Sequence, residues 1–315
     1  MRLVLFLLLA LSSVASAQPF PNKPIRLIAP FAPGGALDLI ARGVGAKLSE
    51  IEGQPVVVEN RAGASGAIGS VAVKDAPPDG YTLLLGATAT HGVNPALNPK
   101  LPYDAVRDFT SISLLATIPH ALVVNASFPA NTVQDLVRIG KSGQPLNYGS
   151  AGPGTPHHLA AELFKSLTGI QATHVPYKGS GPALADLIGG QIQFISVEFT
   201  AAEPHIKSGK LKALATATAQ RVPGLGLPTV AEAGYPAFTV TSWYAIFGPA
   251  GMPQDVTSKL SADIAKALAM PDLNERLRGL GTTPVGSTPQ ELATHVKTEV
   301  ARWTQVVKTA GVKPE

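Results

Sequence analysis

Three short loops rich in glycine and small residues carry the clearest chemistry in the sequence. They are residues 33–35, 63–66 and 149–155, and each directly precedes a stretch with helical hydrophobic spacing. The first N–H groups of a helix lack intrahelical partners and lie at the positive end of its dipole, and glycine leaves such groups unobstructed. Ser150 and Thr155 add hydroxyl donors to the third loop. The loops therefore predict an anion site; the alternative is that their glycines serve only tight turns.

Such a site needs no arginine to hold a carboxylate. A hydrogen bond to a charged group contributes about 1.5–3 kcal/mol. Four or five of them approach the ~8 kcal/mol of a micromolar site.

Catalytic patterns are missing from the sequence. No G-x-S-x-G surrounds Ser65 or Ser150, and no H-E-x-x-H occurs among the seven histidines. His157 and His158 are adjacent, so on a helix they diverge by roughly 100° and suit one metal ion poorly. One of them is expected to cap or pack and the other to be solvated. The glycine patterns match neither the dinucleotide fingerprint nor the Walker motif. We therefore expect no enzyme, no cofactor and no metal.

The elements that position these loops alternate between strands and helices. Residues 23–30 read as a strand, and Leu37, Ile40 and Val44 then follow at helical spacing. Strands at residues 55–59 and 81–86, with a short helix at 67–74 between them, repeat the unit. Alternating strands and helices predict a mostly parallel sheet, in which ligands bind at the carboxyl ends of the strands.

A second set of α/β elements follows a long apolar stretch, residues 112–124, that we expect to run between two lobes. Helices are predicted at residues 132–141 and from the N-cap Thr155, and strands near residues 146–148, 191–197 and 211–217. Residues 242–249 then lead into two amphipathic helices, the second opening on a capping box of Thr288 and Glu291.

Composition and the N-terminus indicate an exported protein. Arg2, nine apolar residues and Ala15-Ser16-Ala17 form a secretory signal peptide, residues 1–17, cleaved after Ala17; a buried strand or an uncleaved anchor is the alternative. The 315 residues suit two lobes and contain no cysteine, which excludes disulfides and thiolate metal sites. The net charge is +4 but no run of Lys or Arg occurs, so a nucleic-acid partner is not expected.

Seven motifs together resemble the Bug-type solute receptors of tripartite tricarboxylate transporters. They lie at residues 31–42 (FAPGGALDLIAR), 57–69 (VVENRAGASGAIG), 79–84 (DGYTLL), 101–104 (LPYD), 148–159 (YGSAGPGTPHHL), 175–184 (VPYKGSGPAL) and 228–234 (PTVAEAG). The resemblance runs from the signal peptide to the C-terminal helix. It implies a two-lobed type II periplasmic binding protein, or Venus-flytrap, fold whose lobes are mostly parallel sheets flanked by helices. Lobe 1 would comprise residues 18–121 plus 241–315, and lobe 2 residues 122–240.

The resemblance also implies a function and a set of site residues. The chain would be a monomeric periplasmic receptor that binds a small organic carboxylate between the lobes and delivers it to integral membrane subunits. Backbone amides, hydroxyls and waters would hold the ligand, with the Gly34 and Gly35 amides facing bridging waters. The implied ligand-binding residues are Phe31, Gly34, Gly35, Asp38 and Thr88 from lobe 1, and Ser150, Gly154, Thr155 and His158 from lobe 2.

One segment departs from the family pattern. Where relatives often carry a hydrophobic-Phe-Asp-Asn-like stretch, this chain reads Ser196-Val197-Glu198-Phe199. Glu198 is therefore a further candidate: it would repel a second ligand carboxylate, accept a ligand hydroxyl or amine, or be solvated.

Several alternatives stay open on the sequence alone. Asp38 would line the site or only pair with Arg42, His158 would contact ligand or pack its helix, and Tyr177 would be a contact or a hinge residue. A ligand-presenting sensory protein keeps the same site with another partner. An exported hydrolase would need Ser150 or Ser65 within ~3 Å of a histidine. Tricarboxylates, dicarboxylates, aromatic acids and amino acids all remain possible ligands.

Overall fold

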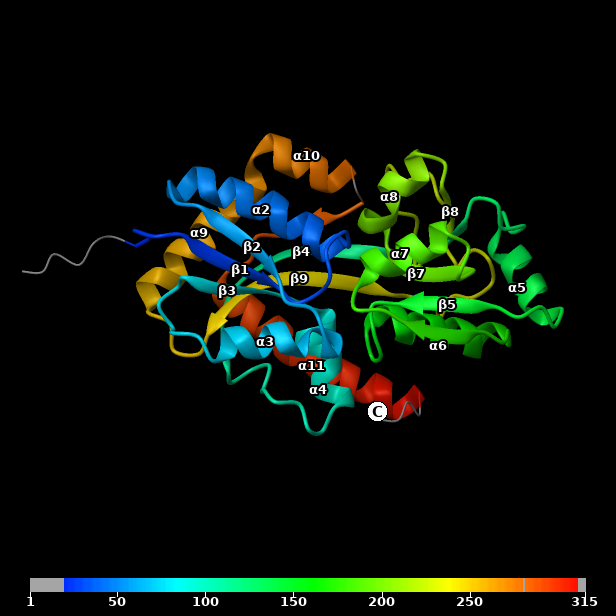
Figure 1. Ribbon diagram of the computed structural model, residues 1–315, viewed down its shortest axis with the longest axis horizontal. Coiled ribbons are helices and arrows are strands. Elements are labelled where there is room, and N and C mark those ends of the chain that lie inside the picture. The colour runs from blue at the N-terminus through cyan, green and yellow to red at the C-terminus, as the bar shows by residue number, and fades with distance from the viewer. Residues whose placement is uncertain (1–19, 280, 311–315) are drawn as a thin grey trace, which may run out of the picture.

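One long sheet with a change of partners at its centre organises the molecule. The computed structural model describes residues 20–279 and 281–310, so the predicted signal peptide and its cleavage site lie outside the described residues. The strands follow the order β2-β1-β3-β9-β4-β7-β5-β6, with β10 and β8 also paired to β4. Helices cover both halves of this sheet (Figure 1). Within the described ranges, no helix is long and apolar enough to cross a membrane.

The first half combines the early part of the chain with its C-terminal part. Its strands are β1 (Ile25–Ala29), β2 (Val56–Asn60), β3 (Thr82–Ala87), β9 (Thr241–Pro249), β10 (Thr283–Pro284) and the start of β4 (Phe109–Asn125). Its helices are α2 (Ala36–Glu52), α3 (Ala67–Lys74), α4 (Asn94–Leu97), α9 (Gln254–Ala269), α10 (Pro271–Gly279) and α11 (Pro289–Ala310), with single helical turns η1 (Ala64–Gly66) and η2 (Ala89–Val93). Strands β2, β1 and β3 are parallel, and β9 is antiparallel to β3.

The second half is built from the middle of the chain. Its strands are β5 (Asn147–Ser150), β6 (Thr173–Pro176), β7 (Phe194–Glu198) and β8 (Leu211–Thr216), joined by the end of β4. Its helices are α5 (Val133–Lys141), α6 (Pro156–Thr168), α7 (Ser180–Ile188) and α8 (Phe199–Lys207). Strands β6, β5 and β7 are parallel, and β4 runs antiparallel to β7. The predicted two-lobed α/β fold, with sheets flanked by helices, is confirmed. The sheets are mixed rather than mostly parallel: β2-β1-β3 and β6-β5-β7 are parallel, whereas β4, β8, β9 and β10 pair antiparallel.

Two segments carry the chain between the halves. Strand β4 pairs with β9 as far as Pro119, opposite Thr241, and with β7 from His120, opposite Glu198. The return lies beside it, where Val240 hydrogen-bonds with His120 and Ala217 through backbone groups. The predicted lobe boundaries, 121 and 241, fall beside these crossings and stay a prediction.

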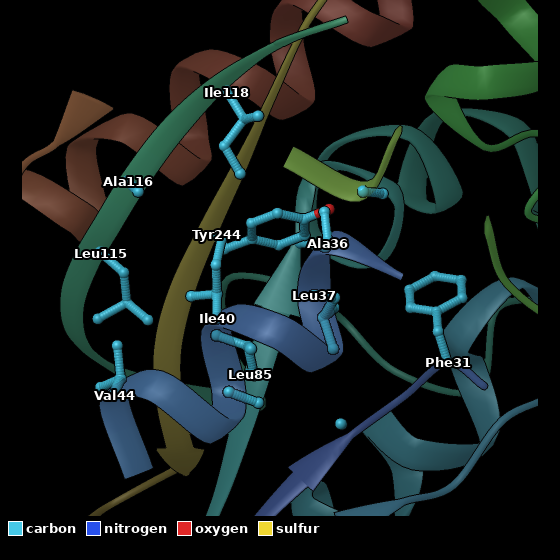
Figure 2. Close-up of a cluster of buried hydrophobic side chains, with 14 of the residues drawn as sticks. Phe31, Ala36, Leu37, Ile40, Val44, Leu85, Leu115, Ala116, Ile118 and Tyr244 are labelled. Atoms are coloured by element: carbon cyan, nitrogen blue, oxygen red, sulfur yellow. The ribbon is translucent and has the colours of Figure 1, made fainter. Parts of the chain in front are cut away.

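The apolar side chains that the sequence places on one face of α2 point into the core. Leu37 and Ile40 of α2 lie near Leu85 of β3, and Val44 faces Leu115 of β4 (Figure 2). The Tyr244 ring of β9 fills the space between this helix and Ile118. Burying each such side chain stabilises the fold by about 1.5–3 kcal/mol. Since α2 starts directly after Gly35, its packing fixes where the first glycine loop points.

Three local predictions need correction. Two helices were expected to close the chain, but α10 lies between them; it buries only Leu273 and Leu277, and its other positions are mostly polar, which weakens its hydrophobic pattern. Helix α8 and strand β6 are present in the structure but were not predicted from the sequence. Thr155 is the N-cap of α6 as predicted, yet its hydroxyl donates to Gly152 O at 2.7 Å and does not cap the helix. The Thr288–Glu291 capping box is confirmed, because each side chain accepts the other residue's backbone N–H.

Candidate ligand-binding site

Two adjoining cavities lie between the halves of the molecule. The outer cavity has a volume of about 400 Å³ and the inner one about 30 Å³, and Phe31 and Ala151 line both. The inner cavity has room for one small polar group. The outer cavity is lined by Phe31, Gly63, Ala64, Ser65, Gly66, Asn94, Leu97, Asn98, Leu101, Ala151, Gly152, Pro153, Gly154, His158, Pro176, Tyr177 and Lys178. All three predicted glycine loops therefore contribute to one region.

Four helices begin at the inner cavity. It is lined by the N-cap residues of α2, α6 and α8, which are Gly35, Thr155 and Glu198, and by Ser180, the first residue of α7. Each helix start presents backbone N–H groups and the positive end of a dipole. Convergence of four such ends favours negative charge at this point.

The first glycine loop touches the loop before α7 across the cleft. Ala32 N–H donates to Lys178 O at 3.0 Å. A Cβ at Gly35 would lie 2.4 Å from Ser180 Oγ, and one at Gly181 would lie 2.2 Å from Pro33 O. Both distances are far inside van der Waals contact. Glycine at 181 therefore lets the two backbones meet, and glycine at 35 leaves room for the Ser180 hydroxyl.

The second glycine loop is strained and also reaches across the cleft. Ala64 and Ser65 adopt φ values of 47° and 51°, a left-handed conformation that non-glycine residues rarely occupy. The Ser65 hydroxyl donates to Pro153 O at 2.6 Å, and Asn94 Nδ2 donates to Ser65 O at 3.0 Å. The strained turn thus presents its hydroxyl to the opposite loop.

The structure divides the predicted site residues into those that line the cavities and those that hold the loops. Lining residues of the inner cavity are Phe31, Gly35, Thr88, Thr155 and Glu198, and those of the outer cavity include Gly154 and His158. Gly34, Asp38 and Ser150 line neither cavity. Direct ligand contact by any of these residues stays a prediction.

Asp38 fixes the first glycine loop through hydrogen bonds to its carboxylate. Its carboxylate accepts hydrogen bonds from Gly34 N–H at 3.2 Å, Arg42 Nε at 3.1 Å and Asn60 Nδ2 at 3.0 Å. Burial alone would raise the pKa of Asp38, but these donors outweigh it and lower the pKa. The Gly34 amide, expected to face a bridging water, is therefore engaged by Asp38.

Ser150 and His158 hold the third loop. Ser150 Oγ lies 2.6 Å from His174 Nε2, and His158 Nδ1 accepts the Gly154 N–H at 3.0 Å. The rings of His158 and His174 stack with centroids 4.1 Å apart. Burial, together with the neighbouring His158, lowers the pKa of His174 to about 4. Tyr177 lines the outer cavity, and its hydroxyl donates to Asp186 at 2.7 Å.

Glu198 is the buried centre of a polar cluster at the crossings. It is 2% exposed, so the solvated alternative is wrong. Its Oε1 accepts the hydroxyls of Ser242 at 2.9 Å and Tyr244 at 3.0 Å, and its Oε2 lies 2.8 Å from His157 Nε2. His120 Nε2 lies 2.8 Å from Ser242 Oγ.

Electrostatics keep this glutamate ionised. Burial alone would raise the pKa of Glu198, but the neighbouring His157 and His120 outweigh it and hold the pKa well below its usual range. Burial and the same carboxylate raise the pKa of Tyr244 well above its usual value, so its hydroxyl keeps its proton and donates. Within the described ranges no group of three or more His, Asp or Glu side chains is arranged to hold a metal ion.

Five residues at the site were not predicted from the sequence: four surround Glu198, and the fifth is the first residue of α7. One of His157 and His158 is expected from the sequence to be solvated. In the structure His157 is buried, and His158 accepts the Gly154 N–H. A signal existed for His120, a lone titratable residue inside the apolar stretch 112–124. The missed residues are His120, His157, Ser180, Ser242 and Tyr244.

Comparison with known proteins identifies the family. Residues 40–312 match the model of the "Tripartite tricarboxylate transporter family receptor". Protein BugT of Bordetella pertussis is 37% identical over 310 residues, 96% of this chain and 94% of BugT.

Two solved structures from Rhodopseudomonas palustris are also similar. Rpa4515 with adipate is 38% identical with a TM-score of 0.90, covering 94% of this chain and 100% of that one. MatC with bound malate is 36% identical with a TM-score of 0.86, covering 91% and 100%. The chain belongs to the tripartite tricarboxylate transporter receptor family, as a Bug-type periplasmic solute receptor.

Proposed function

We propose that this receptor closes its two lobes around a small organic carboxylate and delivers it to the integral membrane subunits of a tripartite transporter. The protein would act as a monomer in the periplasm after cleavage behind Ala17, without enzymatic activity. The observation that carries the proposal is the convergence of four helix N-termini on the inner cavity. A carboxylate there would meet backbone amides and hydroxyls contributed by both halves.

The relatives narrow the substrate class. Adipate and malate, bound by Rpa4515 and MatC, both carry two carboxylates. In this chain the inner cavity suits one carboxylate, and the outer cavity of about 400 Å³ would take the rest of such a ligand. A dicarboxylate of four to six carbons is therefore the first class to test.

The two segments that cross between the lobes would act as the hinge for lobe closure. Lobe 1, residues 18–121 plus 241–315, and lobe 2, residues 122–240, would move as bodies about the segments at Pro119–His120 and Val240–Thr241. Because the ligand would touch both lobes, its binding and the closed population would be linked.

Thermal stability measured with malate, adipate, citrate and benzoate tests this function. A bound carboxylate stabilises the fold by RT ln(1 + [L]/Kd), about 2.7 kcal/mol at one hundred times Kd. Thr155→Val removes the hydroxyl that donates to Gly152 O and should weaken binding at least tenfold, whereas Thr155→Ser keeps the hydroxyl and should bind nearly as wild type. A folded wild-type protein that responds to no carboxylate would contradict the proposal.

One contact favours a second candidate, an exported serine hydrolase. Ser150 Oγ and His174 Nε2 are 2.6 Å apart, which meets the distance that a nucleophile and its base require. Ser150 is fully buried, however, and lines neither cavity, and a histidine with a pKa near 4 is a weak base. Labelling of Ser150 by a serine-reactive phosphonate would support the hydrolase; an unlabelled protein that binds carboxylates would exclude it.

A further inference from the structure

We propose that His157 contacts the ligand carboxylate through Nδ1–H, so that binding is coupled to uptake of one proton by the His157–Glu198 pair. This inference rests on the function proposed above and adds to it a specificity-determining side chain and a pH dependence.

The position of His157 is the first step. It is the second residue of α6, lines the inner cavity and is 5% exposed. Its Nε2 lies 2.8 Å from Glu198 Oε2. Its Nδ1 is buried and has no hydrogen-bond partner among the described residues. An unpaired buried ring nitrogen is unfavourable, and the ligand would supply the missing partner.

The protonation of the ring follows from the hydrogen bonds of Glu198. Its Oε1 already accepts two hydroxyls, and its ionised Oε2 accepts the Nε2–H of His157. In the neutral ring Nδ1 then carries a lone pair, which repels a carboxylate oxygen. Only a ring protonated at both nitrogens can donate to the ligand, and the extra proton belongs to the His157–Glu198 pair as a unit.

The surrounding charges favour this proton once an anion arrives. The groups that face His157 are Glu198 from the end of β7, His120 from β4 with ring centroids 5.2 Å away, and the Tyr244 hydroxyl from β9 through Glu198. Burial lowers the pKa of His120, so that ring competes poorly for this proton. Without uptake, the ligand would add a second negative charge beside Glu198; one proton cancels that addition.

Glu198 is accordingly a positioning residue. Its carboxylate fixes the His157 ring and favours the protonated form, while its own oxygens are occupied by the protein. A ligand ammonium group would meet a protonated His157 ring and a Glu198 carboxylate whose oxygens are already occupied by the protein. The site should therefore select acids over amines.

The test is calorimetric titration of the wild-type protein with malate and with adipate from pH 5.5 to 8.5, in phosphate and in Tris. We expect a difference in heat between the buffers that reports proton uptake. We also expect Kd to rise with pH, by up to tenfold per pH unit, because binding takes up one proton. His157→Gln should bind more weakly at pH 5.5 and lose this slope. Glu198→Gln should move the slope to lower pH.

Controls separate His157 from the other histidines. His205→Gln alters a ring at the far end of α8 and should keep the wild-type slope. In the wild-type protein, 15N spectra of the histidine rings should show His157 gaining a proton when malate is added, a readout that does not depend on a variant's folding. Tight binding without pH dependence, or an unchanged slope in folded His157→Gln, would overturn this inference alone. Failure of every carboxylate to bind wild type would overturn the proposed function and this inference together.

Discussion

Two buried carboxylates determine what the residues around the site can do. Asp38 draws the Gly34 amide, Arg42 and Asn60 together beneath the first glycine loop. Glu198 does the same for His157, Ser242 and Tyr244 beneath the inner cavity. The oxygens of both carboxylates are occupied by protein donors, so neither is expected to bind the ligand directly. Each instead positions the neighbouring groups that would contact it.

Asp38→Asn should destabilise the protein by about 2 kcal/mol, because an amide cannot accept all the donors that now face the carboxylate. The expected effect on ligand affinity is also a loss, since the loop before α2 would be less well fixed. Chemical denaturation monitored by circular dichroism measures the first effect. The control is Asp272→Asn, an exposed partner of Lys47 whose replacement should change stability by less than about 1 kcal/mol.

Acid should remove the contribution of Asp38. Its folded pKa is lowered from the ordinary 3.8, so the stability it contributes is complete above pH 3.8 and is lost as the pH falls through the folded pKa. The wild-type protein should therefore lose stability relative to Asp38→Asn below pH 3.8 and not above pH 5. Parallel acid denaturation curves for the two proteins would show that Asp38 has no such role.

At the scale of elements, the contact between the β1–α2 loop and the start of α7 closes the cleft. Glycines at 35 and 181 let the loops approach, and Ala32 N–H bonds across to Lys178 O. Four helices then begin around the inner cavity. The loops thus act both as the closing contact and as walls of the site.

Gly181→Ala tests this contact. Its Cβ would lie 2.2 Å from Pro33 O, so we expect the loops to separate and carboxylate affinity to fall at least tenfold, with little change in the stability of either half. Gly189→Ala, at the other end of α7, meets only ordinary contacts and should bind as wild type. Equal affinity of the two variants in calorimetry would show that this contact does not support the closed state.

The sequence predicts elements and loops better than it predicts the polar cluster. Glycine loops before helices are local signals, and parallel strands bring their ends together, so the meeting of residues 33–35 and 63–66 follows from spacing. Residues 149–155 follow β5 in the other half, and spacing alone does not place them opposite the first two loops. Glu198 and His157 are 41 residues apart, and Ser242 and Tyr244 reach the same point from β9. Such contacts depend on the register of β4 with β7 and β9, which periodicity does not specify.

At the scale of the whole molecule, the polar cluster lies where the chain crosses between the halves. His120 is the residue at which β4 changes from β9 to β7, and Ser242 and Tyr244 follow the return crossing. A ligand at His157 would therefore be connected to both crossings through Glu198. Closure and protonation would then be linked in one site.

X-ray scattering tests whether the molecule closes as proposed. We expect the radius of gyration of the wild-type protein to decrease when malate or adipate is added, because ligand contacts with both lobes favour the closed state. Gly181→Ala should stay expanded at the same ligand concentration. Identical scattering with and without a ligand that binds by calorimetry would argue against lobe closure.

A crystal structure of the protein with bound malate or adipate tests the central claim most directly. The predicted result is one ligand carboxylate in the inner cavity, at the N-terminus of α6 and within hydrogen-bond distance of His157 Nδ1, with the rest of the ligand in the outer cavity. A carboxylate bound outside these two cavities, or an inner cavity filled by an apolar part of the ligand, would contradict the account.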